Sequence, residues 1–88
     1  MTKEQSKYFT QTTSELRSLI ENRIKVEGNE VDLNDIDVSA ITDMSGLFSW
    51  TYFNGDISGW DVSNVRYNVY TFYNCSIKEE YKPKFKYI

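Results

Sequence analysis

The sequence of 88 residues contains no histidine and only one cysteine, Cys75. The absence of histidine excludes Ser-His-Asp and Cys-His catalysis and histidine metal ligands. A single cysteine permits neither an internal disulfide framework nor a cysteine zinc site. The Asp-x-Asp-x-Asp-Gly pattern of a dedicated calcium loop is also missing. We therefore expect no catalytic residues, no metal site, no cofactor and no enzymatic activity.

Long apolar runs are missing as well. No stretch is long enough to span a bilayer, and Met1 is followed by polar residues rather than by the apolar core of a signal peptide. We therefore expect a cytoplasmic protein that does not associate with membranes. A domain of this length buries only roughly 60–65% of the surface of its unfolded chain, so we expect marginal stability.

The charges that are present are segregated along the chain. Residues 26–65 hold eight acids and no base, whereas residues 1–25 and 66–88 are each net basic. Such segregation indicates a directed electrostatic field. Aromatic residues make up 16% of the chain. So short a chain has too little interior to bury all of these rings, and some of them are expected at the surface.

Residues 13–28 carry the signals of an amphipathic helix. Thr12 and Glu15 have the spacing of a capping box, and Gly28 follows as a C-terminal stop. One face of the predicted helix holds the apolar residues Leu16, Leu19, Ile20 and Ile24. We predict that this helix caps the rest of the domain and that residues 1–12 form a flexible N-terminus.

The centre of the chain contains an internal repeat. Residues 33–41, Leu-Asn-Asp-Ile-Asp-Val-Ser-Ala-Ile, align with residues 57–65, Ile-Ser-Gly-Trp-Asp-Val-Ser-Asn-Val. A period of roughly 20–29 residues with an L-x-x-L-x-L pattern is the signature of leucine-rich repeats, and the spacing of these two segments falls in that range. We predict a short strand in each unit, with Val38 and Val62 on adjacent parallel strands.

These segments resemble a known family. Asp-Val-Ser-Ala-Ile-Thr-Asp-Met-Ser-Gly-Leu-Phe (37–48) and Phe-Asn-Gly-Asp-Ile-Ser-Gly-Trp-Asp-Val-Ser-Asn-Val (53–65) resemble units of the BspA-type leucine-rich-repeat family. The resemblance implies a solenoid used for protein interaction, commonly on bacterial or protozoan surfaces, and no enzymatic activity. The second unit departs from the pattern, because Arg-Tyr-Asn-Val-Tyr-Thr (66–71) stands in place of Thr-Asp-Met-Ser, as a terminal repeat would.

The predicted fold class is α/β. We predict a short leucine-rich-repeat-like solenoid of two units with an N-terminal capping helix and a C-terminal capping strand segment. A single domain would span residues 13–88, with the helix at 13–28, the two repeats at 32–77 and the C-terminal cap at 78–88. Stacked repeats expose their ends, so a two-unit solenoid depends on such caps.

Acidic and aromatic side chains are the candidates for a contact surface. In-register stacking would place Asp37 and Asp61 about 5 Å apart on the open face of the sheet. Either Ser39, Ser63 and backbone amides satisfy these carboxylates, or the carboxylates bind a basic partner. Exposed Trp and Tyr are favoured as binding anchors. The predicted partner-binding residues are Asp35, Asp37, Asp43, Asp61, Trp50, Tyr52, Tyr70 and Tyr73.

The functional hypothesis is a small non-enzymatic protein-binding module with an acidic, aromatic-bearing repeat surface. One alternative is a phage-type anti-defence inhibitor, similar to an anti-CRISPR protein, whose acids imitate phosphates and occupy a nucleic-acid-binding groove. A second alternative is a structural repeat fragment without separate activity. The expected partner is a protein, with a basic surface if the acids take part. Nucleic acid is disfavoured as a partner, because lysines such as Lys82 and Lys84 on an edge strand more often serve solubility.

Overall fold

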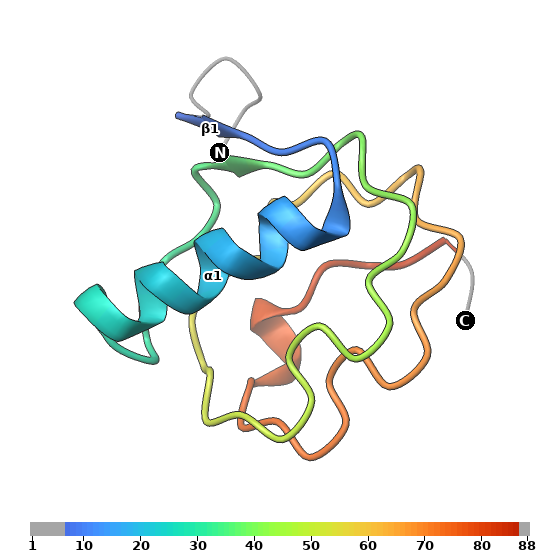
Figure 1. The fold of residues 1–88 in the computed structure, drawn as a ribbon. Helices are drawn as coiled ribbons and strands as arrows, with labels where there is room; N and C mark the ends of the chain where they lie inside the picture. Colours follow the sequence, from blue (N-terminus) through green and yellow to red (C-terminus); the bar gives the residue numbers. More distant parts are fainter. Residues whose placement is uncertain (1–6, 87–88) are drawn as a thin grey trace.

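The computed structural model describes residues 7–86 (Figure 1). Its regular elements are strand β1 (Tyr8–Phe9), helix α1 (Thr13–Glu27), strand β2 (Ile36–Asp37) and the 3-10 helix η2 (Glu79–Tyr81). Turns, bends and irregular segments connect them. Figure 1 shows α1 lying along the looped remainder of the chain. Among the described residues, no helix has both the length and the apolarity needed to cross a membrane.

Helix α1 forms where the sequence predicts it. The Thr12 side chain accepts a hydrogen bond from the Glu15 N–H at 3.1 Å, and the Glu15 carboxylate accepts from the N–H groups of Gln11 and Thr12. These two backbone N–H groups lower the pKa of Glu15. The helix buries Leu16 and Ile20 and ends before Gly28, whose φ is 95°. The predicted capping box is therefore confirmed.

The sheet consists of β1 and β2, which pair in parallel with Tyr8 opposite Ile36. Thr10 extends the contact, because its N–H and its hydroxyl both donate to the Asp37 carbonyl. Strand β1 belongs to the segment 1–12 that was predicted to be flexible, and residues 1–6 of that segment lie outside the described residues.

The predicted fold class is wrong. β2 pairs with β1 and not with a strand around Val62, because residues 57–65 form no strand. The segment 78–88, predicted as a capping strand, contains η2, and residues 87–88 lie outside the described residues. The described residues form a small fold with one α-helix and a two-stranded parallel sheet, and a solenoid of two repeat units is not evident among them.

Aspartate side chains form turns at matching places of the repeated pattern. Asp37 accepts hydrogen bonds from the backbone N–H of Ser39 at 2.9 Å and from its hydroxyl at 2.7 Å. Asp61 accepts the same two bonds from Ser63 at 3.1 and 2.6 Å. Such Asx-turns bend the backbone and compete with strand pairing. The repeated pattern therefore indicates buried side chains and turns, and its two copies pair through the backbone only further along, where a parallel bridge joins Asp43 to Tyr67.

One cluster of apolar side chains fills the interior. Phe48, only 1% exposed, stacks on Phe53 with ring centroids 4.5 Å apart and lies 5.9 Å from Phe72. The indole N–H of Trp60 donates to the Leu33 carbonyl at 2.8 Å. Both halves of the repeated pattern contribute buried residues, namely Leu33, Ile36, Val38, Ile41, Ile57, Trp60, Val62 and Val65.

A row of backbone hydrogen bonds joins residues 44–50 to residues 67–73. Each bond connects an N–H of the first segment to a carbonyl of the second, at 2.7–2.9 Å. The donors Met44, Gly46, Phe48 and Trp50 pair in order with the acceptors Tyr67, Val69, Thr71 and Tyr73. This row holds the two segments side by side, and it positions the candidate site.

Candidate functional site

Asp35, a predicted partner-binding residue, is paired within the chain. Its carboxylate accepts from the Arg23 guanidinium at 3.0 Å, and Glu27 also pairs with Arg23. The guanidinium lies 5.1 Å from the Tyr8 ring centre, and Arg23 is 9% exposed. Burial lowers the pKa of Arg23, but the hydrogen bonds with Asp35 and Glu27 outweigh it and raise the pKa overall. Asp35 therefore helps to hold β1, α1 and β2 together.

The other three predicted aspartates stabilise turns. Asp37 and Asp61 accept hydrogen bonds from Ser39 and Ser63, as the structural one of the two hypotheses expects, and binding of a basic partner by these carboxylates stays a prediction. Asp43 accepts from the backbone N–H of Ser45 at 2.9 Å. The predicted stacking of Asp37 and Asp61 on adjacent strands is wrong, because Asp61 lies outside any strand.

Asp56 stabilises a turn in the same way, although it is not among the predicted partner-binding residues. It accepts from the N–H of Ser58 at 2.9 Å and from the Ser58 hydroxyl at 2.7 Å. The bond from the N–H, followed by the bond from the hydroxyl, lowers the pKa of Asp56. Lysines 82, 84 and 86 line a depression together with Asp61, so basic side chains border part of the acidic segment.

Three of the predicted aromatic residues gather at one exposed place. Trp50 is 71% exposed, Tyr70 67% and Tyr73 51%. Tyr73 makes edge-to-face contacts with both others, at 5.5 Å to Trp50 and 5.2 Å to Tyr70. Val69 lines a depression of about 530 Å³ together with these rings. We call Trp50, Val69, Tyr70 and Tyr73 the aromatic surface.

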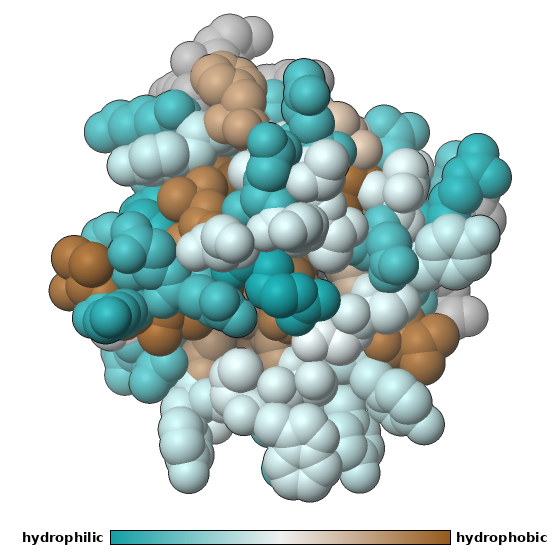
Figure 2. All heavy atoms as spheres, viewed as in Figure 1, coloured by the Kyte–Doolittle hydropathy of each residue, from teal (hydrophilic) through white to brown (hydrophobic). Residues whose placement is uncertain are grey.

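Tyr52, the fourth predicted aromatic residue, borders this surface. It is exposed and lines a neighbouring depression with Trp50 and Asn74. Figure 2 shows hydrophilic side chains gathered over α1 and side chains of intermediate hydropathy along the lower edge of the molecule. In Figure 1 the turns near residues 50 and 74 lie along that same edge.

Two residues of the aromatic surface have unusual backbone conformations. Trp50 and Tyr70 both have φ of 60°, in the left-handed region that bulky side chains rarely adopt. The repeated pattern aligns Tyr70 with Gly46, whose φ is 66°, and Trp50 with Asn74, whose φ is 53°. Glycine and asparagine tolerate this conformation, whereas a bulky residue costs about 1–3 kcal/mol, and such strain clusters at functional sites.

Val69 and Tyr67 are exposed residues that the sequence interpretation missed. A signal for them was present, because the outward positions of residues 43–49 change character in the aligned residues 67–73. Asp43, Ser45, Gly46 and Ser49 are replaced in order by Tyr67, Val69, Tyr70 and Tyr73. The sequence interpretation attributed this change to a terminal repeat, whereas in the structure it produces an exposed apolar surface.

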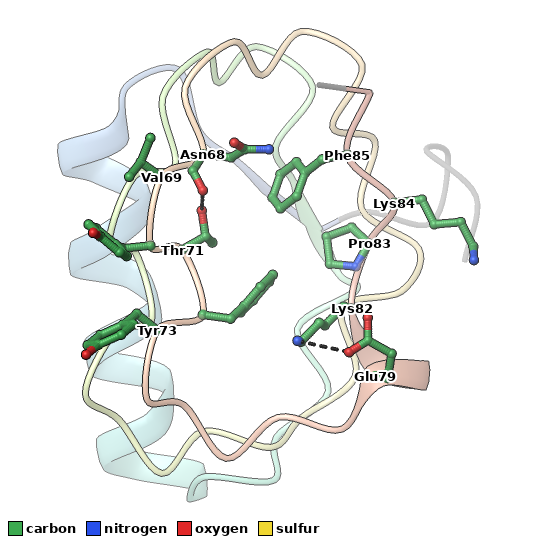
Figure 3. A pocket seen from close by; sticks show the side chains of 11 residues that line it. Asn68, Val69, Thr71, Tyr73, Glu79, Lys82, Pro83, Lys84 and Phe85 are labelled. Atoms are coloured by element: carbon green, nitrogen blue, oxygen red, sulfur yellow. Dashed lines mark hydrogen bonds and ion pairs between the residues drawn. The ribbon is translucent and has the colours of Figure 1, made fainter. Parts of the chain in front are cut away.

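A groove runs beside the aromatic surface (Figure 3). Val69, Thr71 and Tyr73 lie on one side of it, and Pro83, Lys84 and Phe85 lie on the opposite side. The rings of Phe72 and Phe85 face each other across it at 6.2 Å. Lys82 places its ammonium group 5.2 Å from the Phe72 ring centre and 3.1 Å from the Glu79 carboxylate.

Residues 7–86 contain no group of three His, Cys, Asp or Glu side chains that could hold a metal ion. Cys75 is half-buried, with the Thr51 hydroxyl at 3.5 Å and the Phe53 carbonyl at 3.4 Å from its sulfur.

Comparison with known proteins places the chain in one family. A search of the curated proteins and a search of the solved structures each found no match. The family described as "Mycoplasma protein of unknown function, DUF285" matches residues 1–84, a range that includes β1, α1, β2, η2 and the aromatic surface. Because the match spans nearly the whole sequence, the chain belongs to the DUF285 family.

Proposed function

We propose that this chain is a non-enzymatic protein-binding module whose contact site is the aromatic surface. The observation that carries the proposal is the combination of exposure and strain at Trp50 and Tyr70. A side chain that only filled space there would be replaced by glycine or asparagine at a gain in stability. Exposed Trp and Tyr residues are also the commonest energetic centres of protein interfaces.

The arrangement of the rings suits binding without catalysis. The edge-to-face contacts of Tyr73 with Trp50 and Tyr70 restrict ring motion before a partner arrives, so less entropy is lost on association. We propose that the family tie extends to BspA-type proteins, on the basis of the resemblance of residues 37–48 and 53–65. A protein-interaction role for that type supports the same interpretation.

The alternative of an inhibitor whose acids imitate phosphates, which we call the acidic decoy, is less well supported than binding through the aromatic surface. Asp35 pairs with Arg23, and the carboxylates of Asp37, Asp43 and Asp61 accept hydrogen bonds from serines two residues later. A carboxylate that is used in this way is less available to imitate a phosphate. In our proposal, the acids stabilise turns and the aromatic residues make the contact.

Two backbone-compatible variants test the proposal. Trp50→Asn and Tyr70→Gly remove the rings and place at each position a residue that tolerates positive φ. Immobilised wild-type protein and both variants are incubated with cell lysate, and the captured proteins are then titrated individually. We expect each variant to weaken the specific complex by about tenfold or more.

The control variant is Phe9→Ser, which removes an equally exposed ring on β1. It should capture the same partner as the wild type. Equal capture by wild type, Trp50→Asn and Tyr70→Gly would show that the aromatic surface is not the contact site. Binding that falls steeply with salt and is competed by DNA would instead favour the acidic decoy.

A further inference from the structure

The edge of residues 68–74 that faces away from residues 44–50 carries a row of unpaired backbone donors. The carbonyls of Val69, Thr71 and Tyr73 accept hydrogen bonds from residues 46–50. The described chain contains no cis peptide bond, and in a trans peptide the N–H points opposite to the preceding carbonyl. The next N–H groups therefore point to the other side. Those of Tyr70, Phe72 and Asn74 have no hydrogen-bond acceptor anywhere in residues 7–86.

The groove beside the aromatic surface lies along this edge. It is lined by residues 68–73 and by residues of the segment 79–85, and none of residues 44–50 contributes to it. The groove therefore lies on the side toward which these three N–H groups point. Phe72 and Phe85 belong to its apolar lining, together with Val69 and Pro83.

The charge of the groove is positive. Glu79 is the acid among its lining residues, and its carboxylate already pairs with Lys82 at 3.1 Å. Lys84 is exposed on the opposite wall and has no ion pair within residues 7–86. A row of N–H donors without neighbouring acceptors attracts anionic and carbonyl oxygens, and the lysine adds to that attraction.

We propose that this groove binds an extended acidic peptide segment of a partner protein, which accepts hydrogen bonds from the N–H groups of Tyr70, Phe72 and Asn74. In an extended peptide, alternate carbonyls point to the same side, which matches donors at alternate residues. Pairing along a free edge supplies affinity through the backbone, while side-chain pockets supply specificity. Apolar side chains of the peptide contact Phe72 and Phe85, and its carboxylates lie near Lys84.

This inference rests on the proposed function, because it names the chemistry of the partner segment that reaches the molecule beside the aromatic surface. The two can nevertheless fail separately. The aromatic surface is tested by capture of a folded partner with Trp50 and Tyr70 variants, whereas the edge is tested by amide protection with a short peptide. If the peptide fails to protect the amides while the Trp50 and Tyr70 variants still lose the folded partner, the inference is wrong and the proposed function stands.

Amide hydrogen exchange followed by NMR on the full chain tests the edge directly. The probe is an eight-residue peptide that alternates Glu with Val, and the matched control replaces each Glu with Lys. In the free protein, the amides of Tyr70, Phe72 and Asn74 exchange fast, because they lack acceptors. With saturating acidic peptide we expect exchange at these three amides to slow by about tenfold or more. The amides of Phe48 and Trp50 should keep their protection throughout.

A charge variant locates the peptide in the groove. Lys84→Gln should weaken binding of the acidic peptide by about threefold, because it removes one exposed cation beside the peptide. Lys25→Gln removes the same charge from the last turn of α1, which does not line the groove, and should leave the affinity unchanged.

Four results would overturn the inference. The first is that the acidic peptide leaves the amides of Tyr70, Phe72 and Asn74 unprotected. The second is that the lysine peptide protects them equally well. The third is that raising the protein concentration alone protects these amides, which would assign the edge to a second copy of this chain. The fourth is that single-stranded DNA protects these amides and the acidic peptide does not, which would assign the groove to nucleic acid.

Discussion

Residues 33–51 and 57–75 bury side chains of the same kind at a constant offset but expose different ones. Ile41 and Val65 are both buried, and Phe48 stacks against its counterpart Phe72. The outward residues Asp43, Ser45, Gly46 and Ser49 of the first segment correspond in order to Tyr67, Val69, Tyr70 and Tyr73 of the second. Burial in both segments follows from folding, since each buried ring or branched side chain removes apolar area from water. Burial of apolar area does not explain why the outward residues of the two segments differ, so this difference points to function.

The two segments also differ in how their backbone donors are used. The N–H groups of Met44, Gly46, Phe48 and Trp50 are satisfied by the second segment. Within the described residues, the corresponding groups of Tyr70, Phe72 and Asn74 have no acceptor. An open edge is a site for pairing with another chain. The second segment therefore combines several exposed rings with unpaired N–H groups. In the first segment the corresponding N–H groups are paired, and Trp50 is its exposed ring.

The largest expected effect comes from the buried rings of the two segments. Phe48→Ala should lower the free energy of unfolding by about 3–5 kcal/mol, because Phe48 is fully buried against Phe53 and Phe72. Phe72→Ala should cost about half as much, because Phe72 is only partly buried. Urea denaturation measures both. Equal losses in the two variants would mean that Phe48 and Phe72 contribute equally to the stability of the core.

Gly55→Ala is expected to have the next largest effect. A Cβ at Gly55 would lie 1.8 Å from the Val31 carbonyl oxygen and 2.8 Å from the Phe53 ring, so the backbone must shift. We expect a loss of about 3 kcal/mol in the free energy of unfolding. Gly46→Ala is the control, because its Cβ would meet only the Ser49 hydroxyl at an ordinary 3.6 Å. Its loss should be about 1–2 kcal/mol, from backbone conformation alone.

Tyr70→Gly should act in the opposite direction to Gly46→Ala. The two positions have φ of 60° and 66°, so glycine relieves strain at residue 70 and alanine creates it at residue 46. We expect Tyr70→Gly to raise the free energy of unfolding by about 0.5–1 kcal/mol while it weakens partner binding. Thermal unfolding followed by circular dichroism measures the first effect. A loss of stability would mean that the ring supports the fold, which would weaken the argument for function.

The smallest expected effect is on the pH dependence of stability. The pKa of Asp56 is lowered in the folded state by hydrogen bonds from Ser58, so the unfolded chain binds the proton more readily. This stabilisation is present above the unfolded pKa of about 3.9 and is lost as the pH falls through the folded value. Asp56→Asn keeps an acceptor oxygen for the turn but removes the titration. Its stability should therefore fall less steeply than that of the wild type between about pH 5 and 2.

The helix and the buried positions could be predicted from the sequence. Helix α1 depends on bonds between near neighbours, such as the capping pair Thr12 and Glu15, and these are visible in the order of residues. The apolar positions of residues 33–41 and 57–65 also reach the core as their pattern indicates. The candidate site was predicted in part, since Trp50, Tyr70 and Tyr73 do meet, whereas the four aspartates are engaged within the chain.

The order of residues is enough to specify helix α1, its two ends and the apolar side chains that become buried. The pairing of β1 with β2 and the free edge at Tyr70, Phe72 and Asn74 become evident only in the folded chain. The physical reason is that burial and capping depend on residue type and spacing. Backbone pairing depends instead on which distant segments the closed chain brings together, and on the side chains that compete for the same N–H groups.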